Sequence, residues 1–204
     1  MDTKFVWKLC ETSFKEFDRL DPIDKKTLFY NFYTKWNVLE IAMLSIKFND
    51  PYNFYTPLGG AAKPIIDFYG TTTKQNILND DGIKRIFQPL WNFHFENVIP
   101  KLAEMKFDEI ESMALFGILL WDPAYTNINV NLTEICHSMR KIILRELNSY
   151  FQDTQFSTRF FDTLDTLNLI EKAEHKCQQE IELCGVYNFE MDEEMRQMIM
   201  WEKY

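Results

Sequence analysis

Residues 113–121 read Met-Ala-Leu-Phe-Gly-Ile-Leu-Leu-Trp, an unbroken apolar run, and this run decides the fold of the chain. Asp108 stands where it can cap a helix that contains the run. A helix with no polar face has to be buried on every side. A two-layer bundle has no room for such a helix, whereas a three-layer sandwich of helices does. The nine residues are well short of the ~18 that span a bilayer, so we expect no membrane association.

The chain before this run is also patterned as helices. Apolar residues recur every three to five positions over residues 5–20. Asp21 suits an N-cap and Pro22 the first turn of a second helix, which the pattern continues to Ile46. A further helical pattern covers residues 73–105, where two prolines should kink or interrupt it.

Residues 48–70 differ in character from their surroundings. They hold three of the seven prolines and three of the six glycines, so they are the one plausible place for strands. Gly59-Gly60 suits a two-residue hairpin turn. We therefore expect a small β-hairpin near residues 52–69.

Two long helices are expected after the apolar run, because no proline follows Pro123. Apolar stripes predict them over residues 132–150 and 160–183, with Gly185 as a C-cap glycine. A detached amphipathic segment then covers residues 191–201. The predicted class is all-α, a three-layer antiparallel α-helical sandwich that forms a single domain.

Composition and charge narrow the function classes. The 204 residues include 31 acidic and 22 basic side chains, a net charge of −9. Because no cluster of Lys and Arg appears, we expect no direct contact with nucleic acid. The four scattered cysteines indicate a reducing compartment and not a disulfide framework.

No group of residues indicates catalysis, a cofactor or a metal site. The three histidines are far apart and no Cys-x-x-Cys pair occurs. Paired carboxylates such as Asp80-Asp81 fall at turns or helix starts, where capping explains them. A phosphate-binding glycine loop and a nucleophile elbow are also missing from the sequence. We therefore expect no enzyme.

Aromatic and methionine residues are abundant, with 18 Phe, 9 Tyr, 5 Trp and 9 Met. They would suit a well-filled helical core. They would equally suit an apolar pocket whose wall repacks around a ligand. Composition leaves both interpretations open.

Residues 14–40, FKEFDRLDPIDKKTLFYNFYTKWNVLE, resemble the signature of nuclear hormone receptor ligand-binding domains, and most of all the divergent nematode receptors. Residues 111–123, 140–150 and 159–170 are similar to the family's eighth, ninth and tenth helices. The resemblance implies that residues 1–204 form one domain with the same three-layer fold and a small hairpin. Because the match begins near Met1, we expect the family's first two helices and its zinc DNA-binding domain to be absent from this chain.

The resemblance implies an apolar pocket for a small lipophilic ligand of the fatty-acid or sterol type. Its expected lining is Cys10 or Phe14, Leu39, Met43, Phe93 or His94, and Cys177 or Ile181. The tenth helix is the usual dimer face, which implies a homodimer or a heterodimer with another receptor. The residues expected on that face are Arg159, Leu164 and Leu167.

The resemblance also makes residues 190–201 a candidate activation helix, which completes a groove for the Leu-x-x-Leu-Leu helix of a coregulator. The expected groove residues are Lys8, Lys15, Leu28, Glu194, Met195, Gln197 and Met198. The family's charge clamp is altered here, since Gln197 replaces its glutamate and Thr12 its lysine. Lys8, Lys15, Glu193 and Glu194 are the available substitutes.

Two functional hypotheses follow. The first is a ligand-responsive transcriptional regulator in the nucleus, with the cytoplasm as a second location, in which the ligand biases the position of the C-terminal helix. The alternative is a ligand-independent dimerisation or interaction domain, whose pocket is filled by its own side chains.

Overall fold

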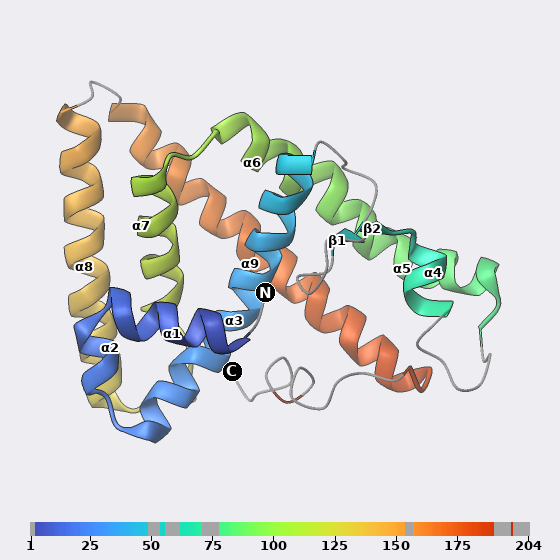
Figure 1. The fold of residues 1–204 in the computed structure, drawn as a ribbon, viewed down its shortest axis with the longest axis horizontal. Coiled ribbons are helices and arrows are strands. Elements are labelled where there is room, and N and C mark those ends of the chain that lie inside the picture. The colour runs from blue at the N-terminus through green and yellow to red at the C-terminus, as the bar shows by residue number, and fades with distance from the viewer. Residues whose placement is uncertain are drawn as a thin grey trace.

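The computed structural model describes residues 3–48, 54–55, 62–70, 78–153, 157–189 and 197. These residues fold as helices in three layers (Figure 1). In chain order the helices are α1 (Thr3–Ser13), α2 (Lys15–Arg19), α3 (Pro22–Phe48), α4 (Ile65–Gly70), α5 (Asp80–Phe93), α6 (Ile99–Met105), α7 (Glu109–Leu120), α8 (Val130–Asp153) and α9 (Ser157–Val186). The predicted all-α class is confirmed.

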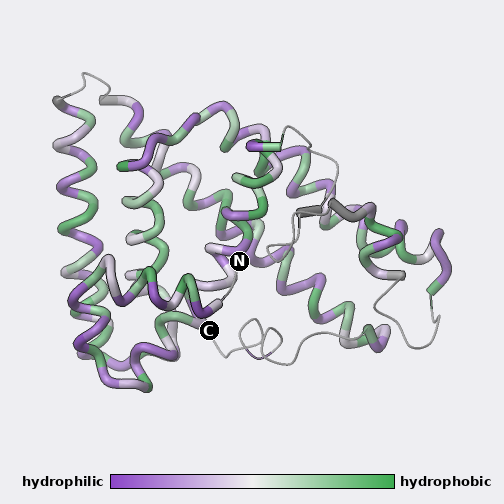
Figure 2. The backbone as a smooth tube through the Cα atoms, viewed as in Figure 1, coloured by the Kyte–Doolittle hydropathy of each residue, from purple (hydrophilic) through white to green (hydrophobic). Residues whose placement is uncertain are grey.

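Helix α7 lies in the middle layer, as its apolar sequence predicts. Its neighbours are α3, α8 and α9, and α1 crosses its lower end (Figure 1). The ring of Phe14 stacks on Phe116 at 6.2 Å between centroids and meets Trp121 edge-on at 5.9 Å. By contrast, polar and apolar residues alternate along α8, which has one face in the core and one in solvent (Figure 2).

Gly117 lets two other segments approach the middle helix closely. A Cβ atom at this position would lie 2.7 Å from Ile143 Cδ1 of α8 and 3.0 Å from Phe14 Cζ. A distance under 3.0 Å is essentially never seen for a real Cβ atom, so the end of the Ile143 side chain would have to shift, and Phe14 would be a tight neighbour. The missing side chain therefore lets Ile143 and Phe14 pack directly against α7.

Both predicted helix starts are confirmed by their caps. Asp21 Oδ1 accepts hydrogen bonds from the backbone N–H groups of Ile23 and Asp24, at 2.9 and 3.0 Å, where α3 begins. Asp108 caps α7 by accepting from the Glu111 N–H at 2.8 Å, and the Glu111 side chain accepts from the Asp108 N–H at 2.9 Å. Such a reciprocal pair satisfies two N–H groups that the helix itself cannot.

Helices α5 and α6 are joined by a π-helical turn, η1 (His94–Val98). The N–H of Ile99 donates to the His94 carbonyl, five residues back instead of four. Pro100, which has no N–H to donate, follows directly. Pro89, the other expected interruption, lies inside α5 without ending it.

The end of α9 differs from the prediction. The helix continues past Gly185 to Val186, and the left-handed residue that ends it is Asn188, with a φ of 54°. Asparagine tolerates this conformation because its short polar side chain can hydrogen-bond locally. The Phe189 N–H then donates to the Cys184 carbonyl at 2.9 Å. The assignment of Gly185 as the C-cap was therefore wrong.

Strands β1 (Phe54–Tyr55) and β2 (Ala62–Lys63) are two residues each and pair antiparallel, Phe54 with Lys63 and Tyr55 with Ala62. The expected Gly59-Gly60 turn lies outside the described residues. So does the expected segment 191–201, apart from Gln197, which is helical and exposed. Over the described ranges, no helix combines the length and apolar character needed to cross a bilayer.

A buried ion network joins the middle layer to α9. Lys35 Nζ of α3 lies 2.6 Å from Asp122 Oδ2, and Arg140 Nη1 of α8 lies 3.1 Å from Asp122 Oδ1. Glu174 of α9 approaches Lys35 at 3.9 Å. Lys35, Asp122 and Glu174 are all buried, so these charges compensate one another where water cannot.

Candidate functional site

A small cavity lies between α3, α5 and α9, where the family resemblance places a ligand. Its volume is about 50 Å³. Its lining is Asn37, Val38, Ile41, Leu90, Trp91, Phe93, His94, Ala173, Lys176, Cys177 and Glu180. The expected residues Phe93, His94 and Cys177 are among them.

Polar groups form part of the cavity wall. Glu180 accepts hydrogen bonds from the Tyr69 hydroxyl and from Trp91 Nε1, the latter at 3.2 Å, and burial raises the pKa of its carboxyl. Burial also lowers the pKa of His94 to about 4, so its imidazole is neutral at pH 7. Asn37 Oδ1 is buried without a hydrogen-bond partner in the described structure. Polar groups therefore stand beside the apolar side chains in this wall.

The other residues expected to line the pocket do not touch this cavity. Cys10 and Leu39 are fully buried in the core, and Phe14 is held between Phe116 and Trp121. Ile181 is also buried and Met43 half-buried. Cys10, Leu39, Phe14 and Met43 belong to the hydrophobic core or pack against it.

A larger depression lies on the surface between α1 and the start of α3. This groove has a volume of about 590 Å³. Its lining is Thr3, Lys4, Trp7, Glu11, Leu20, Pro22, Lys25, Lys26, Phe29 and Tyr30. Trp7 is one of its apolar residues and lies edge-on to Phe29 at 4.9 Å and to Phe17 at 5.5 Å between ring centroids.

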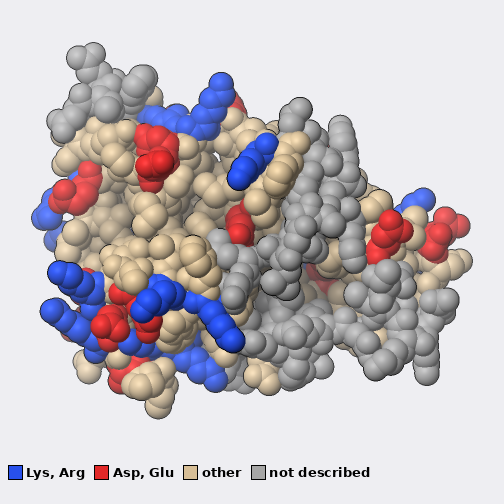
Figure 3. All heavy atoms as spheres, viewed as in Figure 1, with Lys and Arg blue, Asp and Glu red and all other residues tan. Residues whose placement is uncertain are grey.

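The charged residues of the groove are mostly lysines. Lys25 Nζ lies 3.1 Å from Asp18 and 3.9 Å from Glu11, and Lys26 Nζ lies 5.1 Å from the centre of the Tyr30 ring. At the lower left of Figure 3, where α1, α2 and the start of α3 lie, Lys and Arg side chains gather with acidic residues among them.

None of the residues expected in a coregulator groove is among those that line this depression in the described structure. The side chain of Leu28 is fully buried in the core. Lys8 is exposed beside the groove, 3.8 Å from Glu11, and Lys15 is exposed on α2. Glu194, Met195 and Met198 lie outside the described residues. Trp7 and Glu11 were missed, although their spacing from Lys4 places all three on one helix face.

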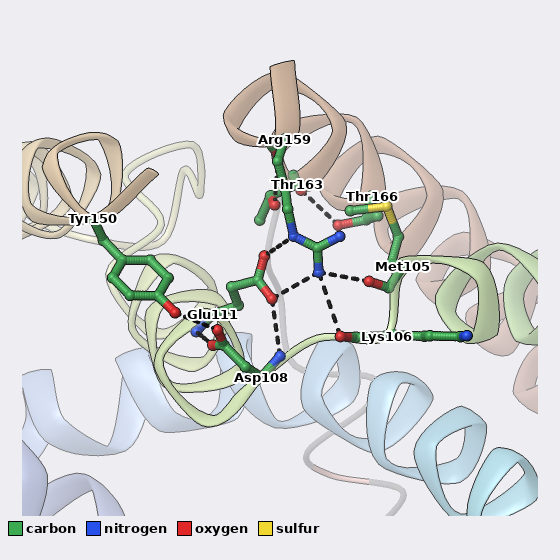
Figure 4. A network of polar contacts seen from close by, with 8 residues as sticks. All are labelled: Met105, Lys106, Asp108, Glu111, Tyr150, Arg159, Thr163 and Thr166. Carbon is green, nitrogen blue, oxygen red and sulfur yellow. Dashed lines mark hydrogen bonds and ion pairs between the residues drawn. The ribbon is translucent and has the colours of Figure 1, made fainter. Parts of the chain in front are cut away.

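The expected dimer-face residue Arg159 is bonded inside the chain (Figure 4). Its Nη2 donates to Glu111 Oε2 at 2.8 Å and to the Met105 carbonyl at 2.6 Å, and its Nε pairs with Glu111 Oε1. The hydrogen bond to Glu111 raises the pKa of the guanidinium. Nearby, the Tyr150 hydroxyl donates to Asp108 at 2.6 Å. Arg159 therefore holds α9 to the start of α7.

Of the other residues expected on the dimer face, Leu167 is buried and Leu164 is half-buried within the chain. On this part of α9 the large exposed apolar side chain is Phe161. Among the residues that the structure describes, no three His, Cys, Asp or Glu side chains come together as metal ligands would.

Comparison with known proteins agrees with this arrangement. The family model for the ligand-binding domain of nuclear hormone receptor matches residues 4–187. Nuclear hormone receptor family member nhr-150 of Caenorhabditis elegans is 34% identical over 198 residues, covering 94% of this chain and 56% of that protein. Member nhr-16 of the same organism is 24% identical over 193 residues, covering 92% and 50%. The chain thus spans about half the length of these curated relatives.

Proposed function

This chain belongs to the nuclear hormone receptor ligand-binding domain family, and on that premise we propose that it regulates transcription by holding a coregulator helix in the groove between α1 and α3. The observation that carries the proposal is the groove itself, with Trp7 and Phe29 in its apolar floor. An amphipathic helix binds such a groove through apolar side chains on one face. Residues 190–201 are the segment that we propose as the activation helix beside it.

The interior supports the ligand-independent form of this function. Ligand pockets for drug-sized molecules hold about 300–1,000 Å³. The cavity between α3, α5 and α9 holds about 50 Å³, room for one or two water molecules. Stacked rings of Tyr69 and Phe87, 4.0 Å apart between centroids, fill space close by. We propose that these side chains take the place of a fatty acid or sterol.

Native mass spectrometry of the purified chain tests this point directly. We expect the mass of the polypeptide alone, because the described cavity has no room for a lipid chain. The matched control is a denaturing spectrum of the same preparation, which gives the polypeptide mass free of any bound molecule. A stoichiometric extra mass that extracts into organic solvent as a lipid would contradict the side-chain-filled interior.

The groove is tested by shortening two of its apolar side chains. We expect Leu20→Ala together with Tyr30→Ala to weaken binding of a fluorescent Leu-x-x-Leu-Leu peptide by roughly tenfold or more, the effect of losing about 1.4 kcal/mol of contact. Fluorescence anisotropy measures the affinity, and thermal melting checks that both proteins are folded.

The matched control for the groove variant is Ile23→Ala. Ile23 is also apolar, lies at the start of α3 and is highly exposed, but it does not line the groove. The Ile23→Ala protein should bind the peptide with the same affinity as the wild type. If the control and the groove variant weaken the peptide equally, the peptide binds elsewhere and the proposed function is wrong.

A further inference from the structure

We infer that the groove between α1 and α3 selects helices that carry acidic residues beside their apolar anchors, an inference that rests on the proposed function. Three of the residues that line the groove are lysines, Lys4, Lys25 and Lys26, and one is acidic, Glu11. The groove is thus a locally basic surface on a chain whose net charge is −9.

The charge of Glu11 is already engaged by its neighbours. Its Oε1 accepts a hydrogen bond from Trp7 Nε1 at 2.9 Å. Lys8 Nζ lies 3.8 Å from its Oε2, and Lys25 Nζ lies 3.9 Å from its Oε1. A basic partner would have to compete with these groups for the one carboxylate in the lining. Lys25 is itself paired with Asp18 at 3.1 Å, but the lining still holds three lysines against one carboxylate, and this balance of charge favours an acidic partner.

The lysines can bind carboxylates without giving up the apolar floor. Their aliphatic stems lie along apolar surface while the ammonium groups stay in water. Lys26 shows this arrangement, with its Nζ 5.1 Å from the centre of the Tyr30 ring. A helix whose apolar face packs on Trp7 would then place acidic residues beside this lysine. The expected occupant is an acidic amphipathic helix of a second protein.

Charge complementarity at such a rim mainly governs selectivity and the rate of association. Because the chain as a whole has a net charge of −9, an acidic partner is attracted by the local charge of the groove and not by the net charge of the chain. The contribution of these charges to binding should also weaken as salt is added, because the Debye length falls from ~10 Å at 0.1 M to ~3 Å at 1 M. Selectivity and salt dependence are therefore the two measurable signatures.

The experiment uses the full chain and two fluorescent peptides with the same Leu-x-x-Leu-Leu core. One peptide carries three Glu residues in its flanks, and the other carries three Lys residues at the same positions. At about 50 mM salt we expect the acidic peptide to bind roughly tenfold more tightly, and the difference should shrink at about 500 mM salt. Anisotropy titrations give all four affinities.

Charge reversal locates the effect. We expect Lys4→Glu with Lys26→Glu to remove or invert the preference for the acidic peptide. The matched control is Lys141→Glu with Lys172→Glu, which makes the same change of net charge at exposed positions on α8 and α9. If the control shifts the preference as much as the groove variant, net charge alone explains it and the inference is overturned.

Two further results separate this inference from the proposed function. If both peptides bind equally and both weaken in the Leu20→Ala, Tyr30→Ala variant, the charge selectivity is wrong while the docking function stands. If neither peptide binds, the proposed function fails and the inference with it. The segment of this chain at residues 190–201 is itself acidic, so the full-length variant Asp192→Asn, Glu193→Gln, Glu194→Gln completes the set. A tenfold gain in peptide affinity there would assign the groove to this segment and overturn the assignment to a second protein.

Discussion

Leu119→Asp is expected to abolish the cooperative unfolding transition of this protein. Leu119 is 3% exposed and lies in α7, the helix with neighbours in α3, α8 and α9. A carboxylate at this position would be taken out of water. Burying an unpaired charge costs several kcal/mol or more, comparable with the 5–15 kcal/mol that stabilises a typical domain. Circular dichroism, recorded during heating and during a urea titration, shows whether the cooperative transition is lost.

Met113→Asp is the matched control on the same helix. Met113 is 44% exposed, so the same new charge stays in water and should change stability by about 0.5 kcal/mol or less. Together the two variants test the position of α7 and not only its composition. Wild-type melting of the Leu119→Asp protein would refute the middle-layer placement.

Arg159→Met is expected to have the second largest effect. It removes the guanidinium that pairs with Glu111, whose side chain is only 2% exposed. Breaking a buried pair in this way costs about 3–5 kcal/mol, because the remaining carboxylate stays buried without its cation. For a domain of this size the melting temperature should fall by roughly 10 °C. Urea unfolding curves of the variant and the wild type give the change in the free energy of unfolding.

Two comparisons isolate this effect. Arg145→Met removes a cation from the exposed pair with Glu146, whose atoms lie 3.1 Å apart, and should cost less than about 1 kcal/mol. Adding Glu111→Gln to Arg159→Met should restore part of the loss, because the buried charge is then gone. Equal destabilisation by Arg159→Met and Arg145→Met would show that the buried pair stabilises the fold no more than the exposed pair does.

The features that local chemistry determines could be predicted from the sequence. Asp21 and Asp108 were identified as caps because a side-chain oxygen at a helix start satisfies nearby N–H groups within three residues. The burial of α7 followed from the absence of any polar face over residues 113–121. Neither prediction needed to know what the helix packs against.

The face of α1 could not be determined in this way. Apolar residues occur at Phe5 and Leu9 and also at Val6 and Cys10, one position later. The structure buries Val6 and Cys10 and leaves Phe5 59% exposed. Two adjacent apolar stripes can each face the core, and spacing contains no information on which of them does. The groove beside α1 was missed for the same reason.

Contacts between residues that are distant in sequence could not be predicted either. Arg159 was assigned to an outer dimer face, yet its partner Glu111 lies 48 residues earlier. Tyr69 meets Glu180 across 111 residues and shapes the cavity wall. A carboxylate on a helix looks the same in sequence whether it is solvated or paired inside. Only the packing of the helices distinguishes the two cases.

The π-helical turn at His94–Val98 has a consequence for how relatives of this chain are aligned. Each residue turns an α-helix by about 100°, and a π-helical turn accommodates one residue more than a regular turn. A relative with one residue fewer here would have a regular helix, and the correct alignment would leave a single gap inside a continuous helix. Without that gap, Leu102 and Met105, both buried here, would be matched to residues on a different face of α6.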